Sequence, residues 1–170
     1  MLASNGIDLP VLNVFRMFSR MRGQRLAVES DGAVPLEAIL RGGVRSQPDV
    51  SALASFETNK IWVMAWHYHD DDVAGPDAKV DVAFNNLPTR GDHLRIRQFR
   101  IDERHTNPWA LWKAMGSPAQ PTDVQYGKLA EAGHLRESAE PIDLDTTGGT
   151  TKARLILPRH GIALLELEWD

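Results

Sequence analysis

The sequence predicts a mainly β fold: an antiparallel β-sandwich with an N-terminal helix and one or two short helices in a long loop. About seven short runs rich in β-branched and aromatic residues are separated by turn signals, which is typical of an antiparallel sandwich. One of these runs, residues 60–68, is apolar at nearly every position. We expect that run to be the central strand.

The central run predicts a strand that is covered on both sides. Alternate side chains of a strand point to opposite faces. One face carries Ile61, Val63, Ala65 and His67, and the other carries Trp62, Met64, Trp66 and Tyr68. Because both faces are largely apolar, neither is expected to face water. Residues 50–57 precede this run across a tight turn and should pair with it as a hairpin.

Length and composition exclude several classes of protein. The chain has 170 residues, 42% of them hydrophobic and 25% charged, as in an ordinary globular protein. The net charge of −4 argues against a nucleic-acid partner. Without cysteine there is neither a disulfide nor thiolate chemistry. We expect no cofactor, since no glycine-rich phosphate loop is present. No secretion signal or apolar membrane span is visible, so we expect a soluble protein, with the cytoplasm favoured.

The N-terminal segment predicts an apolar helix that begins near Pro10 and ends before Gly23. Its apolar positions recur at helical spacing, with Leu12 and Met17 beside them. The stripe comprises Val11, Val14, Phe15, Phe18 and Met21. So wide a stripe must be buried, either on the chain's own sandwich or on a partner outside this chain. Self-association through the Val11–Met21 helix is a further hypothesis.

The remaining elements follow from local signals. Strands are expected at residues 24–30, 80–84, 93–101, 151–157 and 161–169, and helices at 108–115 and 121–132. The last two strands are expected to form a hairpin across residues 158–160. A helical turn is expected at residues 36–40. Glu166 and Glu168 should form the solvent side of the last strand, and Arg95, Arg97 and Arg100 should lie on a half-exposed strand.

Two groups of side chains are candidates for chemistry. His67, His69 and Asp70 could hold zinc or another metal ion, because histidines two apart on a strand share a face. The alternative is a buried histidine followed by a solvated acidic turn. Trp109 and Trp112, beside Asn107, could form a sugar-stacking platform at the edge of a substrate cleft. The alternative is that the two tryptophans anchor a long loop and Asn107 caps a helix.

Several segments in the same order resemble the C-terminal part of a family 39 glycoside hydrolase, the β-xylosidase family. The segments are Gly6–Phe18, Trp66–Asp72, His105–Trp109, Trp112–Pro118, Pro121–Thr122 with Gln125–Tyr126, and Leu157–Gly161 with Leu164–Leu167. The resemblance implies a catalytic (β/α)₈ barrel followed by a β-sandwich. Residues 1–23 would then be the remnant of the last barrel helix, and residues 24–170 the C-terminal sandwich.

The resemblance also implies where the chemistry lies. The family's two catalytic glutamates, one of them preceded by asparagine, belong to barrel strands upstream, and this chain contains no Asn-Glu dipeptide. We therefore carry over no catalytic residue. The chain is expected to be the inactive accessory sandwich of an enzyme that hydrolyses xylo-oligosaccharides, with an upstream barrel as its partner. The alternative is a free-standing carbohydrate-binding or protein-interaction module.

Overall fold

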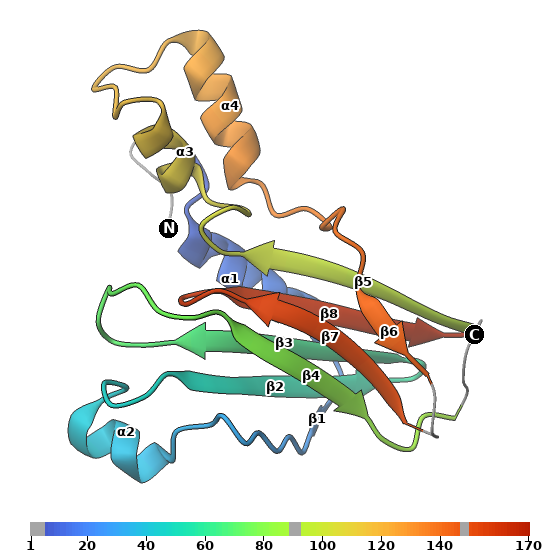
Figure 1. Cartoon of the computed structure of the whole chain (residues 1–170). Helices are drawn as coiled ribbons and strands as arrows, with labels where there is room; N and C mark the ends of the chain where they lie inside the picture. The colour runs from blue at the N-terminus through green and yellow to red at the C-terminus, as the bar shows by residue number, and fades with distance from the viewer. Residues whose placement is uncertain (1–5, 89–92, 147–149) are drawn as a thin grey trace.

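The computed structural model describes residues 6–88, 93–146 and 150–170, which form two antiparallel β-sheets and four helices (Figure 1). In chain order the elements are α1 (Pro10–Arg20), β1 (Gln24–Leu26), α2 (Leu36–Gly42), β2 (Asp49–Glu57), β3 (Lys60–Tyr68), β4 (Ala78–Phe84), β5 (Leu94–Ile101), α3 (Pro108–Ala114), α4 (Asp123–Gly133), β6 (Asp143–Asp145), β7 (Thr151–Leu157) and β8 (Ile162–Trp169). The predicted mainly β sandwich is confirmed. None of these helices has the length and apolar character to cross a membrane.

The larger sheet has the strand order β1-β2-β3-β8-β5, and the smaller has the order β4-β7-β6. The strand β3 lies in the middle of the larger sheet, with Trp62 opposite Ser55 on β2 and opposite Glu166 on β8. The predicted hairpin of β2 and β3 and the central position of β3 are therefore confirmed.

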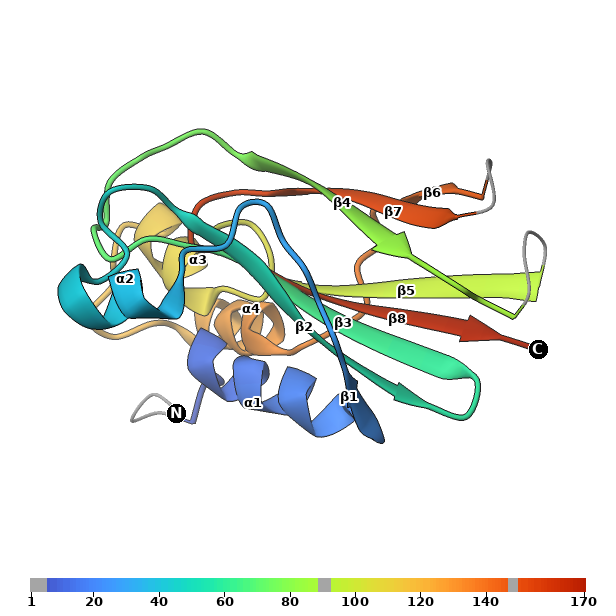
Figure 2. The same cartoon turned by 90° about the horizontal axis from the view of Figure 1, so that it is seen from below.

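The main core lies between the two sheets. One face of β3 contributes Val63 and Ala65, and the facing strands contribute leucines and alanines that exclude water. The buried residues of this cluster are Ala54, Val63, Ala65, Phe84, Ala153, Leu155, Leu157, Ala163, Leu165 and Leu167. Figure 2 shows the smaller sheet over one face of the larger sheet and α1 over the other.

The helix α1 closes a second core on the outer face of the larger sheet. Its residue Met17 is fully buried and packs with Trp62 and Met64 of β3 and Leu164 of β8. Polar contacts hold the same side of the helix. The side-chain amide of Asn13, which is also fully buried, donates a hydrogen bond of 2.6 Å to the carbonyl of Gly133 at the end of α4.

The opposite side of α1 is not covered. The side chains of Val11, Phe15 and Phe18 are spaced by four and three residues and so share one face of the helix. They are 48%, 57% and 45% exposed. The chain's own sandwich therefore covers one side of the predicted apolar stripe and leaves an apolar row facing outward.

The predicted hairpin of the last two strands is wrong. The strand β7 pairs with β4 and β6, whereas β8 pairs with β3 and β5, so the turn between them crosses from one sheet to the other. Burial explains the separation. Side chains of β7 alternate between buried and exposed, as on an outer sheet, whereas β8 is buried on both faces and needs neighbours on each side.

Smaller differences between the predicted and the observed elements concern the segments that connect the main strands. The first strand ends at Leu26 rather than at residue 30, α2 extends the expected helical turn to seven residues, and β6 is a strand that the sequence did not predict. The glycine that separates α1 from β1 is required by geometry. Gly23 has φ = +75°, and a Cβ there would lie 2.1 Å from the carbonyl oxygen of Phe56.

Candidate functional site

The predicted metal ligands His67 and His69 are engaged with backbone groups. Nδ1 of His67, a residue only 2% exposed, lies 3.0 Å from the carbonyl oxygen of Leu157. His69 accepts a hydrogen bond at Nδ1 from the amide of Asp71, so its Nε2–H donates to the carbonyl of Arg45 at 3.1 Å. Both imidazoles thus connect the end of β3 to neighbouring segments.

Asp70, the third predicted ligand, has a similar structural role. Its carboxylate accepts a hydrogen bond from the amide of Val44 at 2.9 Å and lies 3.6 Å from Nε of Arg45. It also hydrogen-bonds the hydroxyl of Tyr68, which raises the pKa of that phenol. Among residues 6–88, 93–146 and 150–170, no three His, Cys, Asp or Glu side chains are grouped so that they could hold a metal ion.

The two predicted sugar-stacking tryptophans lie together on α3. The rings of Trp109 and Trp112 stack with centroids 4.7 Å apart and an interplanar angle of 25°. Trp109 is 56% exposed, whereas the indole N–H of Trp112 donates to the carbonyl of Pro118. Asn107 serves as the helix cap, since its side chain accepts from the amide of Ala110. Its side chain is therefore committed to the first turn of α3.

A charged cluster joins the end of β5 to the loops beside α3. The carboxylate of Asp102 is buried, and it accepts from Nδ1–H of His105 at 2.7 Å and from the guanidinium of Arg100 at 3.0 Å. Arg100 also donates to Glu140 at 2.8 Å and to the carbonyl of Ile156. Arg100, His105 and Glu140, with Asn107, line an open cavity of about 580 Å³. Arg100 is therefore buried, contrary to the half-exposed position that the sequence suggested.

The environment of Asp102 predicts a pH dependence of folding. Burial alone would raise the pKa of this carboxyl, but hydrogen bonds from His105 and from the amide of Arg104, together with the charge of Arg100, hold its pKa below the usual value. In the unfolded chain the pKa returns to about 3.9. The carboxylate therefore contributes its full stabilisation above about pH 4, and this stabilisation is lost as the pH falls toward the folded-state pKa.

We expect Asp102→Asn to flatten the decline of unfolding free energy below about pH 4. Urea unfolding followed by circular dichroism between about pH 5 and 2 measures this slope. The matched control is Asp31→Asn, because Asp31 is exposed. Equal slopes in the wild type and in Asp102→Asn would show that this carboxylate does not carry the acid sensitivity.

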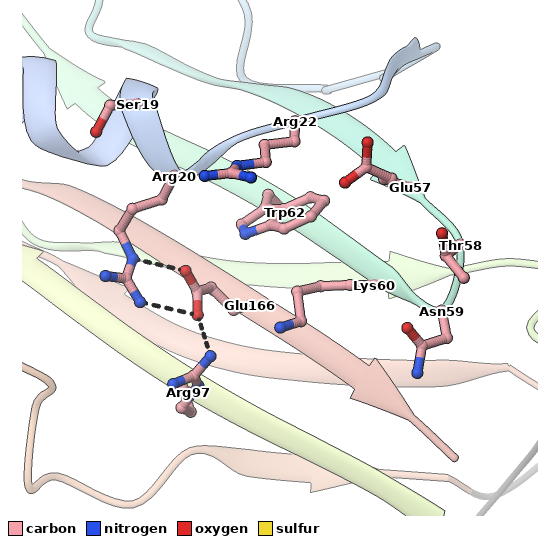
Figure 3. Close-up of a pocket in the computed structure, with 10 residues that line it drawn as sticks. All are labelled: Ser19, Arg20, Arg22, Glu57, Thr58, Asn59, Lys60, Trp62, Arg97 and Glu166. Carbon is pink, nitrogen blue, oxygen red and sulfur yellow. Dashed lines mark hydrogen bonds and ion pairs between the residues drawn. The ribbon is translucent and has the colours of Figure 1, made fainter.

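A second charged cluster lies under the C-terminal end of α1 and is drawn in Figure 3. The side chain of Glu166 on β8 is only 3% exposed. Its Oε1 accepts from Nε of Arg20 at 2.7 Å, and its Oε2 accepts from Nη2 of Arg97 at 2.7 Å and from Nη2 of Arg20 at 3.2 Å. The guanidinium of Arg20 also lies over the ring of Phe99, 4.1 Å from its centroid.

The expected solvent position of Glu166 is therefore wrong, and the reason is α1. Alternate residues of β8 do share a face, but this face of the larger sheet is covered by the helix, so Glu166 is buried beside Trp62. Glu168, near the end of the strand, remains partly exposed and bonds Lys60 at 3.0 Å. Basic side chains therefore hold both carboxylates in place.

An open cavity of about 610 Å³ adjoins Glu166. Its lining residues come from α1 and the segment that follows it, the turn between β2 and β3, and the strands β2, β3, β5 and β8 of the larger sheet (Figure 3). They are Ser19, Arg20, Arg22, Glu57, Thr58, Asn59, Lys60, Trp62, Arg97 and Glu166. None of the sequence-predicted site residues lines this cavity. The only sequence signal for this cavity was the run of arginines on β5. The pairing of β5 with β8 brings one of these arginines to the buried carboxylate.

Comparisons with known proteins place the chain among glycoside hydrolases. The family model described as glycosyl hydrolases family 39 matches residues 1–148. The GH39 enzyme from Xanthomonas axonopodis pv. citri has the same fold, with a TM-score of 0.69 and 14% identity, over 99% of this chain and 32% of that one.

Two structures from Caulobacter crescentus give the same result. A monomeric β-xylosidase from strain CB15 matches with a TM-score of 0.69 and 18% identity, over 98% of this chain and 32% of that one. A GH39 β-xylosidase matches with a TM-score of 0.63 and 19% identity, over 98% and 29%. The chain thus spans about a third of the length of these enzymes. Because the family model covers most of its residues, the chain belongs to glycosyl hydrolases family 39.

Proposed function

We propose that this chain is the non-catalytic β-sandwich part of a β-xylosidase-like enzyme that hydrolyses xylo-oligosaccharides. Its role is to brace a catalytic (β/α)₈ barrel that carries both reactive glutamates. The observation that carries this proposal is the outward apolar row of Val11, Phe15 and Phe18 on α1. A row of three large apolar side chains at helical spacing is the kind of surface that packs against another body.

Two further observations support a bracing role. The chain covers about a third of the length of three solved family 39 proteins, two of which are described as β-xylosidases. Most of such an enzyme therefore lies outside these residues. In addition, the inner side of α1 is held on the sheet by Met17, Asn13 and Arg20. A helix that is fixed to the sandwich on one side and apolar on the other can hold a docked barrel in a fixed position relative to the sandwich.

The test compares Phe15→Glu with the control Leu40→Glu, in which an exposed leucine of α2 is changed. In the chain alone we expect Phe15→Glu to leave the unfolding free energy within about 0.5 kcal/mol, because the side chain is exposed. In a polypeptide that joins a family 39 catalytic part to Met1 of this chain, we expect Phe15→Glu to lower the melting temperature and the activity on aryl xylosides, and Leu40→Glu to change neither.

Two results would contradict this proposal. One is turnover of aryl xylosides by the purified chain above a heat-killed control. The other is equal tolerance of Phe15→Glu and Leu40→Glu in the joined polypeptide, since the apolar row would then contact nothing.

A second candidate function is sugar binding through α3, favoured by the exposed ring of Trp109 stacked on Trp112. A titration with neutral xylo-oligosaccharides, followed by tryptophan fluorescence, separates the two functions. Bracing alone predicts no saturable change. A saturable change that is lost in Trp109→Ala would instead establish a carbohydrate-binding surface on α3.

A further inference from the structure

We propose that the cavity beside Arg22 is a binding site for one carboxylate, carried by an acidic sugar of the uronic-acid class. The choice of a sugar as ligand rests on the proposed function. The existence of a carboxylate site rests on the charges, free donors and shape of the cavity, which lies at the C-terminal end of α1 on the outer face of the larger sheet (Figure 3).

The charges around the cavity leave one positive charge without a counter-ion. Four basic residues line it, Arg20, Arg22, Lys60 and Arg97, against the two acids Glu57 and Glu166. The bond of Lys60 to Glu168 brings in a third acid from just outside the lining. The arrangement therefore has a net charge of one positive unit, which a single carboxylate would neutralise.

Free donors are available for that carboxylate. A guanidinium has five N–H donors. Arg20 uses two of its nitrogens on Glu166, and Arg97 uses one. Within the described part of the chain Arg22 makes no hydrogen bond or ion pair, and its guanidinium extends toward the cavity (Figure 3). Its planar fork can bind both oxygens of a carboxylate, which is the stronger geometry for such a pair.

The rest of the lining suits a sugar ring. Its volume of about 610 Å³ falls within the range of about 300–1,000 Å³ that is usual for small-molecule sites, whereas a carboxylate alone needs far less room. The hydroxyl of Thr58 and the side-chain oxygen of Asn59 can meet sugar hydroxyls at the turn between β2 and β3, and the largely buried Trp62 also lines the cavity, where its indole can report on binding. Asn59 is held in place, because its Nδ2 donates to the carbonyl of Trp169.

The test titrates the purified chain with sodium D-glucuronate and, separately, with neutral D-xylose, following tryptophan indole N–H resonances by NMR. We expect saturable shifts at Trp62 with glucuronate and none with xylose. Arg22→Gln should weaken glucuronate binding about tenfold or more, because a charge-assisted pair is lost. The matched control is Arg25→Gln, since Arg25 is exposed on β1 and is no part of the cavity lining. It should bind glucuronate as the wild type does.

Three results would overturn the proposal: no saturable glucuronate binding, equal binding by Arg22→Gln and Arg25→Gln, or equally tight binding of sodium sulfate, which would indicate a general anion effect. Tighter binding of N-acetyl-glutamate amide than of glucuronate would also overturn it, since the site would then take an acidic protein side chain. The bracing role is tested separately, by the activity of the joined polypeptide on neutral xylosides, so either idea can fail without the other.

Discussion

Replacing Glu166 by glutamine should lower the unfolding free energy by about 3 kcal/mol, near the lower end of the range for breaking a buried ion pair. The expected cost is high because this one carboxylate holds two arginines, Arg20 and Arg97, at 2.7 Å. Without the negative charge of this carboxylate, nothing offsets the repulsion between the two guanidinium groups. The lower end applies because both arginines remain about a third exposed, at 37% and 34%, so water reaches part of each charge.

Equilibrium unfolding in urea measures this loss, and the matched control lies two residues along the same strand. Glu168→Gln removes a carboxylate that is 36% exposed and, within the described part of the chain, pairs only with Lys60, so it should cost less than about 1 kcal/mol. Equal losses for the two substitutions would mean that burial of Glu166 under α1 adds nothing to its contribution.

Replacing Met17 by alanine should lower the unfolding free energy by about 2–5 kcal/mol. Met17 is fully buried between α1 and the outer face of the larger sheet, where it contacts the cluster of Trp62, Met64 and Leu164. Truncation would leave a cavity that a helix fixed at both ends cannot collapse, because Asn13 and Arg20 hold it on either side of Met17. The loss should therefore lie in the usual range for a core methionine.

The neighbouring residue supplies the control. Phe18 is 45% exposed on the outward face of the same helix, so Phe18→Ala should cost less than about 1 kcal/mol in the isolated chain. Urea unfolding of both variants, with tryptophan fluorescence as the signal, gives the comparison. A larger loss for Phe18→Ala than for Met17→Ala would show that α1 packs on the sheet through its other face.

Local patterns in the sequence predicted much of this fold. Alternation in residues 60–68 identified a strand covered on both faces, because each face needs its own apolar partner. Both expected helices of this region begin at capping residues: Asn107 caps α3, and Thr122 with Gln125 forms the capping box of α4. Such signals act within a few residues of the chain, so a single sequence contains them in full.

The features that the sequence did not predict depend on contacts between distant residues. Nothing local distinguishes a hairpin of β7 and β8 from the observed crossing between sheets. Likewise Glu166 looks like the polar side of an alternating strand, and only the position of α1, 146 residues earlier, buries it. The histidines at 67 and 69 match a metal pattern in the sequence, but the backbone carbonyls that they meet belong to β7 and to the segment before β2, 90 and 24 residues away along the chain.

The attachment of α1 to the outer face of the larger sheet has a practical consequence for shortening this chain. Residue 24 looks like a natural start for the sandwich, since α1 ends at Arg20 and β1 begins at Gln24. A protein begun there would lack the helix and uncover Trp62, Met64 and Leu164 on one face of its larger sheet. It would also leave Glu166 without Arg20. Such a product should aggregate during expression, so the leading helix has to be retained in any soluble minimal version of the domain.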